Sequence, residues 1–234
     1  MTNPYESGVL LRQYLDFHYR GETPDYLPHH PLPPGILAYP RRCADKLARA
    51  ATRFDRALDL GCAVGGSTFV LSRSFQEVVG IDFAQRFIDT AQLLAREGLF
   101  RSSEDTWHLP SEVRKSVPQF LQGDACDLPD SLGRFDAILL ANLLCRLPDP
   151  AACLQGLRKL TAPGSVILIT TPCSWDDGYT PPEKQLRPTL EGLHQLLDPW
   201  CDCLEVTEMP FVLRDHVRRA QFTVAQASTW RVRL

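Results

Sequence analysis

Two acidic side chains flank a glycine-rich turn, at a spacing suited to binding a charged, nucleotide-sized ligand. Residues 57–82 read ALDLGCAVGGSTFVLSRSFQEVVGID. Asp59 stands just before the turn, and Asp82 ends the next apolar run. A carboxylate at Asp59 would repel a pyrophosphate but attract a cationic amine or sulfonium. Asp82 can accept hydrogen bonds from both ribose hydroxyls. The pair therefore favours an adenosine ligand that carries positive charge.

The glycine spacing argues against a bound dinucleotide. The dinucleotide fingerprint is Gly-x-Gly-x-x-Gly, whereas the glycines here are Gly61, Gly65 and Gly66. An NAD-dependent oxidoreductase is therefore disfavoured. A strand-ending aspartate such as Asp82 is often only a cap for the next helix. With a glycine turn about 20 residues earlier, ligand binding is the stronger interpretation.

The elements that must position these groups follow from hydrophobic periodicity. Apolar runs predict five buried strands, at residues 56–60, 77–82, 118–121, 135–141 and 165–171. Helical spacing predicts helices at residues 5–19, 41–52, 67–74, 84–97, 149–160 and 189–197. Strand-like runs at 204–207 and 221–229 close the sheet. We predict a Rossmann-like α/β fold with a seven-stranded, mostly parallel sheet, an antiparallel last strand and helices on both faces.

Length and composition favour a single soluble domain. A chain of 234 residues fits one doubly wound domain, with 1–52 as a helical and proline-rich lid segment and 53–234 as the core. The formal charge of −3 disfavours a nucleic-acid partner. Neither a signal sequence nor an apolar run of membrane-spanning length is present, so we expect a cytoplasmic protein without a membrane partner.

The cysteines and histidines do not predict a metal site. The eight cysteines are scattered, and several fall in apolar runs, which favours reduced, partly buried thiols. Cys201 and Cys203 lack a second ligand pair, and His29 and His30 are accompanied by no further ligand cluster. We therefore expect no bound metal.

The turn at residues 59–65, Asp-Leu-Gly-Cys-Ala-Val-Gly, resembles the first motif of class I S-adenosylmethionine (SAM)-dependent methyltransferases. That motif usually has glycine where Ala63 stands, and one added methyl group is a mild departure. Gly-Asp-Ala at 123–125 is similar to the adenine-contacting segment of the same class. The resemblance implies SAM as methyl donor. The expected cofactor-binding residues are Asp59, Gly61, Cys62, Ala63, Gly65, Asp82, Phe83, Asp124, Ala125 and Asn142.

Flanking segments make the resemblance more specific. They are Tyr5-Glu6-Ser7, residues 14–19, residues 80–83, residues 141–147 and the tail from Met209. With the Cys-Ala-Val-Gly turn, they are similar to the 4-mercaptohistidine N1-methyltransferases of ovothiol synthesis, found alone or as the carboxyl-terminal part of a histidylcysteine sulfoxide synthase. The resemblance implies methylation of the N1 (π) imidazole nitrogen of 4-mercaptohistidine (5-thiohistidine), giving ovothiol A. We expect a stand-alone enzyme, functionally coupled to a separate sulfoxide synthase.

Three residues are candidates for a direct part in methyl transfer. Asn142 follows the strand 135–141, where a carboxamide can orient a polar atom of the acceptor. A turn asparagine that satisfies the backbone is about as consistent with the spacing. His18 and Tyr19 would orient the acceptor ring or take up a proton. A mercaptoimidazole that has lost a proton needs no strong base.

An amino-acid acceptor also needs a clamp for its carboxylate. Arg42, Arg146 and Arg214 are the candidates, because a guanidinium binds a carboxylate bidentately. For each of them, a solvated surface charge is the alternative. The expected ring contacts come from Tyr14, Trp175 and Tyr179, besides Asn142. Two functional alternatives remain: a methyltransferase for another small acceptor, and a SAM-binding protein without catalysis.

Overall fold

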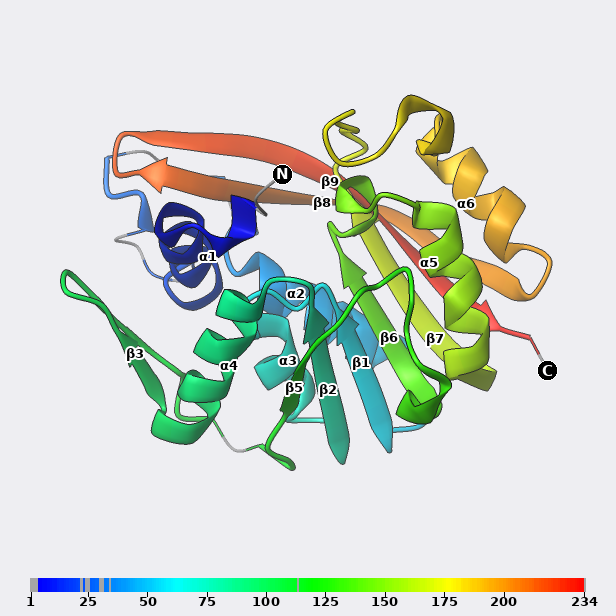
Figure 1. Cartoon of the computed structure of the whole chain (residues 1–234), viewed down its shortest axis with the longest axis horizontal. Coiled ribbons are helices and arrows are strands. Elements are labelled where there is room, and N and C mark those ends of the chain that lie inside the picture. The colour runs from blue at the N-terminus through cyan, green and yellow to red at the C-terminus, as the bar shows by residue number, and fades with distance from the viewer. Residues whose placement is uncertain are drawn as a thin grey trace.

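A seven-stranded sheet in the order β5-β2-β1-β6-β7-β9-β8 forms the centre of the computed structural model (Figure 1). The structure describes residues 4–21, 23, 26–29, 32–33, 35–112 and 114–233. The parallel strands are β5 (Gln119–Gln122), β2 (Glu77–Asp82), β1 (Arg56–Leu60), β6 (Phe135–Ala141) and β7 (Thr161–Thr171). The last strand, β9 (Arg219–Val232), is antiparallel to both β7 and β8 (Cys201–His216). The predicted fold is confirmed.

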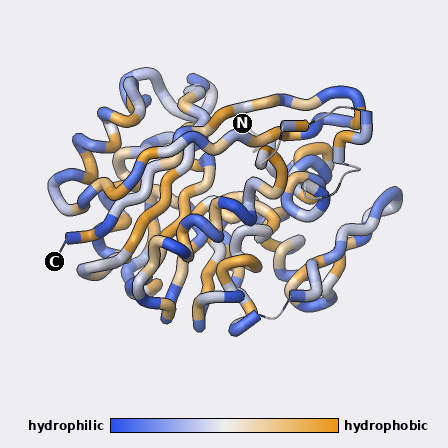
Figure 2. Tube along the Cα trace, turned by 180° about the vertical axis from the view of Figure 1, so that it is seen from behind, coloured by the Kyte–Doolittle hydropathy of each residue, from blue (hydrophilic) through white to orange (hydrophobic). Residues whose placement is uncertain are grey.

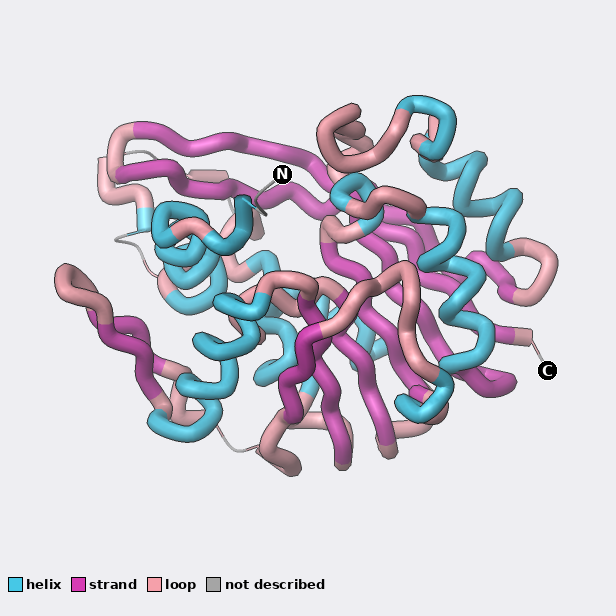
Figure 3. The backbone as a smooth tube through the Cα atoms, in the orientation of Figure 1, coloured by secondary structure: helices cyan, strands magenta, loops and turns pink. Residues whose placement is uncertain are grey.

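Six α-helices surround the sheet in the described residues (Figure 3). They are α1 (Gly8–Tyr19), α2 (Tyr39–Ala50), α3 (Gly66–Leu71), α4 (Gln85–Glu97), α5 (Pro150–Leu157) and α6 (Thr189–Leu197). Short 3₁₀ turns precede or follow several of them: η1 (Pro4–Glu6), η3 (Asp130–Leu132), η4 (Leu144–Arg146), η5 (Arg158–Leu160) and η6 (Pro182–Lys184). Asp149 caps α5, because its Oδ1 accepts a hydrogen bond from the Ala152 amide at 2.9 Å.

The two faces of the sheet bury alternate residues of the same strands. Leu58 and Ile138 pack in a core with Leu154 of α5 and Leu193 of α6. Ala57, one residue before Leu58, packs on the opposite face in a second core that includes helix α2. Figure 2 shows hydrophobic residues concentrated along the central strands. This burial on both faces explains why these strands are continuous apolar runs.

The structure differs from the sequence-based prediction in three segments. Residues 98–115, for which the sequence predicts no helix or strand, contain a small antiparallel hairpin of β3 (Leu99–Arg101) and β4 (Thr106–His108). The predicted helix at 67–74 is the shorter α3. The two closing strands are much longer than predicted and form one extended hairpin that projects past the other strands, as Figure 1 shows. Many side chains of β8 are polar and exposed, so its sequence has no continuous apolar run that would predict the whole strand.

The amino-terminal segment covers the outer edge of β8. Three alternate carbonyl oxygens of this edge strand accept hydrogen bonds from it: Pro210 from Arg42, Val212 from the Tyr26 hydroxyl at 3.3 Å, and Arg214 from Gln13 at 3.2 Å. An unpaired strand edge is a site for unwanted pairing, so these side chains protect it. Part of the proline-rich lid segment lies outside the described residues, namely Pro24, His30, Pro31 and Pro34. The division into a lid segment and a core remains a prediction.

Candidate cofactor and acceptor site

The turn between β1 and α3 has the left-handed backbone that its glycines permit. Gly61 and Gly65 have φ of 78° and 86°. A Cβ on Gly65 would also lie 2.7 Å from a ring carbon of Phe120. Glycine is therefore required at this position for both its backbone conformation and its lack of a side chain. Ala63 has φ of 47°. A non-glycine residue in this region costs roughly 1–2 kcal/mol, so the alanine departure is more costly than the added methyl group alone suggested.

Asp82 joins this turn to the next helix. One carboxylate oxygen accepts from the Ala63 amide at 2.9 Å, and the other accepts from the Ala84 amide at 2.9 Å. Burial raises the pKa of the Asp82 carboxyl group, and these amides oppose the rise. Asp82 therefore anchors the turn and fixes Ala84, the residue before α4, and its position at the end of β2 matches the one expected for a ribose ligand.

Asp59 is buried on the α3 side of β1. Its Oδ2 accepts a hydrogen bond from the Thr68 hydroxyl at 2.7 Å. Burial raises the pKa of Asp59 to about 7, while the bond from Thr68 lowers it. Near neutral pH the group therefore changes charge readily, and a cation bound beside it would favour the carboxylate.

The residues expected around adenine lie on adjoining loops. The Gly123 amide donates to the Asp82 carbonyl at 3.0 Å, and the Gln122 side chain donates to the Phe83 carbonyl at 3.2 Å. Phe83 is 61% exposed, which leaves an aromatic face open for stacking. Asp124 accepts from the Cys126 amide at 2.8 Å, which fixes its loop. The donor, acceptor and stacking groups present fit an adenosine ligand of the SAM type.

Three tyrosines from separate segments meet beside Asp82, and we call them the tyrosine cluster: Tyr5, Tyr14 and Tyr179. The ring centroid of Tyr5 lies 6.0 Å from that of Tyr14 and 6.2 Å from that of Tyr179. Both other hydroxyls are within hydrogen-bonding reach of the Tyr5 hydroxyl. Burial, and next the charge of Asp82, raise the pKa of Tyr14 to about 12. The cluster therefore adjoins the end of β2.

Arg146 is the one of the three candidate clamps that reaches this cluster. Its guanidinium carbon lies 4.8 Å from the Tyr179 ring centroid, which is a cation–π contact. It also interacts electrostatically with Tyr5 and Tyr14. Within the described part of the chain, no ion pair involves this guanidinium. A half-buried cation without a protein counter-ion is suited to binding an anionic ligand group.

The other two arginines hold the fold together, which corrects their expected role as carboxylate clamps. Arg42 donates to the carbonyl oxygens of Ile36, Leu37 and Pro210. Arg214 forms an ion pair with Asp16 and donates to the Tyr26 carbonyl at 2.9 Å. The guanidinium groups are thus already paired between the amino-terminal segment and β8.

Trp175 is also placed differently from the prediction. Its side chain is only 8% exposed and packs in the core that α5 and α6 cover. The indole N–H donates to the Thr189 hydroxyl at 3.1 Å. Trp175 therefore fastens the loop after β7 to the start of α6, and its expected contact with the acceptor ring is corrected.

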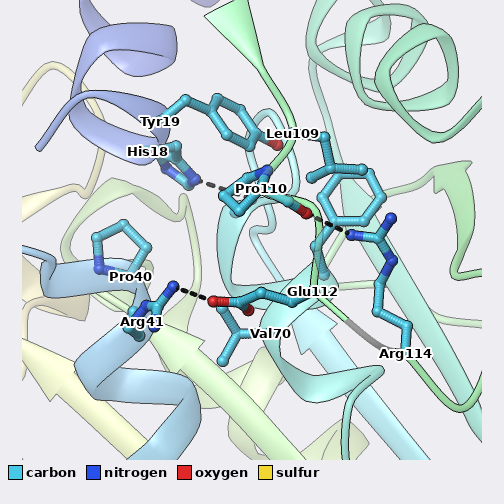
Figure 4. Close-up of a pocket in the computed structure, with 11 residues that line it drawn as sticks. His18, Tyr19, Pro40, Arg41, Val70, Leu109, Pro110, Glu112 and Arg114 are labelled. Carbon is cyan, nitrogen blue, oxygen red and sulfur yellow. Dashed lines mark hydrogen bonds and ion pairs between the residues drawn. The ribbon is translucent and has the colours of Figure 1, made fainter. Parts of the chain in front are cut away.

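His18 and Tyr19 support the glycine-rich turn from the α1 side. His18 Nδ1 accepts from the Gly66 amide at 3.0 Å, and the Tyr19 hydroxyl donates to the Val64 carbonyl at 2.6 Å. Both line a small hollow of about 30 Å³, with Arg41 and Glu112 across it (Figure 4). Burial lowers the pKa of His18 to about 3. These contacts show that both residues position the turn, and their expected part in catalysis remains a prediction.

Asn142 lies at the end of β6 with φ of 55°, a left-handed conformation that asparagine tolerates better than most residues. Its Oδ1 lies 3.1 Å from both the Tyr39 hydroxyl and the Thr170 hydroxyl. Tyr39 and Thr170 were not predicted as site residues. Tyr5 was also missed as a contact. All three come from segments whose approach to the site depends on the whole fold.

The polar groups at the carboxyl ends of β1 and β2 thus fit a SAM-type ligand, and comparison with known proteins gives the family. A family model described as a methyltransferase domain matches residues 37–224. The chain therefore belongs to the methyltransferase domain family, and it is an enzyme of the SAM-dependent class. Among the described residues, no group of histidine, cysteine or acidic side chains could hold a metal ion. No helix in the same part of the chain is long and apolar enough to cross a membrane.

Curated relatives share about half of this chain. The ubiquinone biosynthesis O-methyltransferase of Psychrobacter arcticus is 27% identical over 126 residues, which covers 54% of this chain and 44% of that protein. The demethylmenaquinone methyltransferase of Lactococcus lactis is 31% identical over 118 residues, which covers 49% and 41%. The ajmaline N-methyltransferase of Rauvolfia serpentina is 27% identical over 136 residues, which covers 57% and 41%. The chain thus spans less than half the length of these relatives.

Solved structures share the fold over most of the chain. The N-methyltransferase NodS from Bradyrhizobium japonicum, in complex with S-adenosyl-L-homocysteine, has a TM-score of 0.56 and 18% identity and covers 95% of this chain and 98% of its own. The N-terminal domain of EvdMO1 with the same product bound has a TM-score of 0.54 and 20% identity and covers 83% and 81%. At such identities the likeness establishes the fold.

Proposed function

We propose that the chain transfers a methyl group from SAM to the N1 (π) imidazole nitrogen of 4-mercaptohistidine, which gives ovothiol A. The observation that carries this proposal is the guanidinium of Arg146 beside the tyrosine cluster at the end of β2. This combination suits a small amino-acid acceptor, because the guanidinium can bind its carboxylate while the aromatic rings enclose its planar ring. The resemblance of the flanking segments to the ovothiol enzymes selects this acceptor among small amino acids.

SAM supplies an electrophilic methyl group on its sulfonium. The protein residues align the acceptor and exclude water. Arg146 would fix the carboxylate end, and the tyrosine cluster would cover the acceptor between α1 and the loop after β7. A mercaptoimidazole that has lost a proton already carries electron density on its ring nitrogens. A dedicated base is therefore unnecessary, which agrees with the structural use of His18 and Tyr19.

A second candidate is methylation of another small acceptor. It is favoured by the curated relatives, whose names place them in ubiquinone, menaquinone and alkaloid chemistry. An acceptor without an anionic group offers no counter-ion for Arg146. A SAM-binding protein without catalysis would need no acceptor subsite. The charge and polarity around Arg146 therefore support a small polar acceptor.

The test is turnover of the purified protein with SAM and 4-mercaptohistidine. Mass spectrometry should show a thiol heavier by one methylene group, and two-dimensional NMR should place the new methyl on N1. Histidine, ergothioneine and a catechol serve as alternative acceptors in parallel reactions. Turnover of one of these without turnover of 4-mercaptohistidine would favour the second candidate. SAM binding without turnover of any of them would favour the non-catalytic alternative.

A further inference from the structure

Three side chains from different elements form a hydrogen-bonded relay behind the carboxyl ends of β6 and β7. The Tyr39 hydroxyl, at the start of α2, lies 2.8 Å from the Thr170 hydroxyl of β7. The Thr170 hydroxyl lies 3.1 Å from Asn142 Oδ1. Thr170 also fixes the backbone of Asn142, whose amide donates to the Thr170 carbonyl at 2.9 Å. Tyr39 is 2% exposed and Thr170 is fully buried, so water does not compete for these bonds.

The oxygen of the Asn142 carboxamide faces the relay, 3.1 Å from both hydroxyls, and the count of hydrogens agrees with this orientation. Each hydroxyl has one hydrogen to donate. Thr170 Oγ1 already accepts from the Asn142 backbone amide at 3.1 Å and from Tyr39 at 2.8 Å. If the amide group of Asn142 faced inward, a third donor would point at Thr170 Oγ1, and the Thr170 hydrogen would have to turn to the Tyr39 oxygen. With Oδ1 inward, Tyr39 donates to Thr170 and Thr170 donates to Asn142.

The amide nitrogen of Asn142 consequently faces away from the relay. It makes no hydrogen bond to the described residues and is not one of their buried polar atoms without a partner, so it is accessible. The strained left-handed backbone at Asn142 is held by the two bonds to Thr170. Strain kept by surrounding structure at a strand end is typical of functional residues.

We infer that Tyr39 and Thr170 are positioning residues, which hold Asn142 with its NH₂ group toward the acceptor. The site then presents hydrogen-bond donors to the acceptor and binds it as an anion. Arg146 contributes the matching positive charge. The inference rests on the proposed methyl transfer to a small acceptor. It adds that the acceptor binds in its ionised form. Analogues of the same shape whose ring and sulfur stay protonated and neutral should therefore not be substrates.

A direct test uses the side-chain amide of Asn142. The chain has two asparagines, Asn3 and Asn142, so ¹⁵N labelling of asparagine alone gives two side-chain NH₂ signals. The Asn142→Ser variant assigns the pair. We expect one sharp Asn142 pair in the wild type and in Thr170→Ser, which keeps the hydroxyl. In Thr170→Val, which is nearly isosteric, the pair should broaden or divide between two orientations. An unchanged pair in Thr170→Val would overturn the relay.

Kinetics provide the second measurement. Thr170→Val should lower kcat about tenfold, which corresponds to roughly 1.4 kcal/mol of transition-state stabilisation, with unchanged SAM affinity. Thr170→Ser should restore kcat. A merely structural role would lower the melting temperature of Thr170→Val while leaving kcat unchanged at temperatures where the variant is folded. Absence of wild-type turnover with 4-mercaptohistidine would contradict the proposed function, and the amide spectrum would still decide the relay.

Discussion

The imidazole Nδ1 of His18 accepts a hydrogen bond from the backbone amide of Gly66 at 3.0 Å, across 48 residues of sequence. Gly66 begins α3, and a Cβ there would lie 2.5 Å from the same nitrogen, so only glycine allows this approach. The bond requires an unprotonated Nδ1. His18 therefore serves the fold as a neutral acceptor that holds the start of α3.

This role predicts a loss of stability in acid. Burial lowers the pKa of His18 from 6.5 to about 3. Between these values the unfolded chain binds a proton that the folded chain does not, so the unfolding free energy falls as the pH falls below 6.5. Each pH unit removes up to about 1.4 kcal/mol. His18→Gln should lack this slope in urea unfolding at pH 5 and 7.5. Tyr19→Phe, which removes a neighbouring bond without a charge, should keep it.

Asp59 predicts a slope of opposite sign. Burial raises its pKa from 3.8 to about 7. Here the folded chain holds a proton that the unfolded chain has released, so the unfolding free energy falls as the pH rises from about 4 to 7. Asp59→Asn can still accept from Thr68, and its unfolding free energy should exceed that of the wild type by about 1–4 kcal/mol at pH 7.5. A lower value would contradict the burial cost.

The slopes of His18 and Asp59 overlap in pH and partly cancel, so the wild-type profile alone tests neither. Each variant should reveal the slope of the other residue. Ligand binding separates them further. A cation bound beside Asp59 favours its carboxylate, so SAM binding below pH 7 should release a proton, which calorimetry in buffers of different ionisation enthalpy measures. Asp59→Asn should show no such release and weaker SAM binding.

The cofactor half of the site could be predicted because its residues are close in sequence. The turn from Asp59 to Gly65 and the acid at Asp82 belong to one β-α-β unit, whose geometry is set by local backbone rules. The central parallel strands β1, β2, β6 and β7 could be predicted for a related reason, since burial on both faces makes them mainly apolar. The β8–β9 hairpin extends past the sheet, where one face is solvated, and its full length gave no such pattern.

The acceptor half could not be predicted to the same depth, because its contacts join distant segments. Arg42, Arg146 and Arg214 have the same chemistry in the sequence. Arg42 pairs with Pro210, and Arg214 pairs with Asp16, at separations of 168 and 198 residues. Only the folded chain shows that these two guanidinium groups have protein oxygens as partners, whereas Arg146 has an aromatic ring beside it and no ion pair among the described residues. Local spacing in the sequence gives no information on such long-range contacts. For the same reason, the hydrogen bonds that join Tyr39 and Thr170 to Asn142 could not be predicted.

Asp82 predicts a loss of cofactor affinity on substitution. A hydrogen bond to a charged group contributes about 1.5–3 kcal/mol, so Asp82→Ala should weaken SAM binding at least about tenfold. The variant also loses the acceptor for the Ala63 and Ala84 amides, so its melting temperature should fall. Calorimetry below that temperature separates the two effects. Asp89→Ala, which removes an exposed acid on the following helix α4, is the matched control, and equal affinity in both variants would refute the ribose contact.

Arg146 predicts a loss confined to the acceptor. Without the guanidinium, the acceptor carboxylate loses a charge-assisted bond of about 1.5–3 kcal/mol, so Arg146→Ala should raise the KM for 4-mercaptohistidine about 10- to 100-fold. SAM affinity should stay unchanged. Arg146→Lys should recover only part of the loss, because an ammonium group cannot bind a carboxylate through a planar pair of donors. Arg187→Ala, an exposed arginine in the loop after β7, is the control.

A decarboxylated acceptor shows whether the carboxylate is the group that Arg146 binds. The KM of the wild type for 4-mercaptohistamine should be as high as the KM of Arg146→Ala for 4-mercaptohistidine. In each case the bond between the guanidinium and the acceptor carboxylate is missing. Arg146→Ala should then treat the two acceptors alike, because the interaction energy in this cycle belongs to the guanidinium–carboxylate pair. If Arg146→Ala still preferred the amino acid by the wild-type ratio, another residue would bind the carboxylate, and Arg146 would act on the ring or its thiolate.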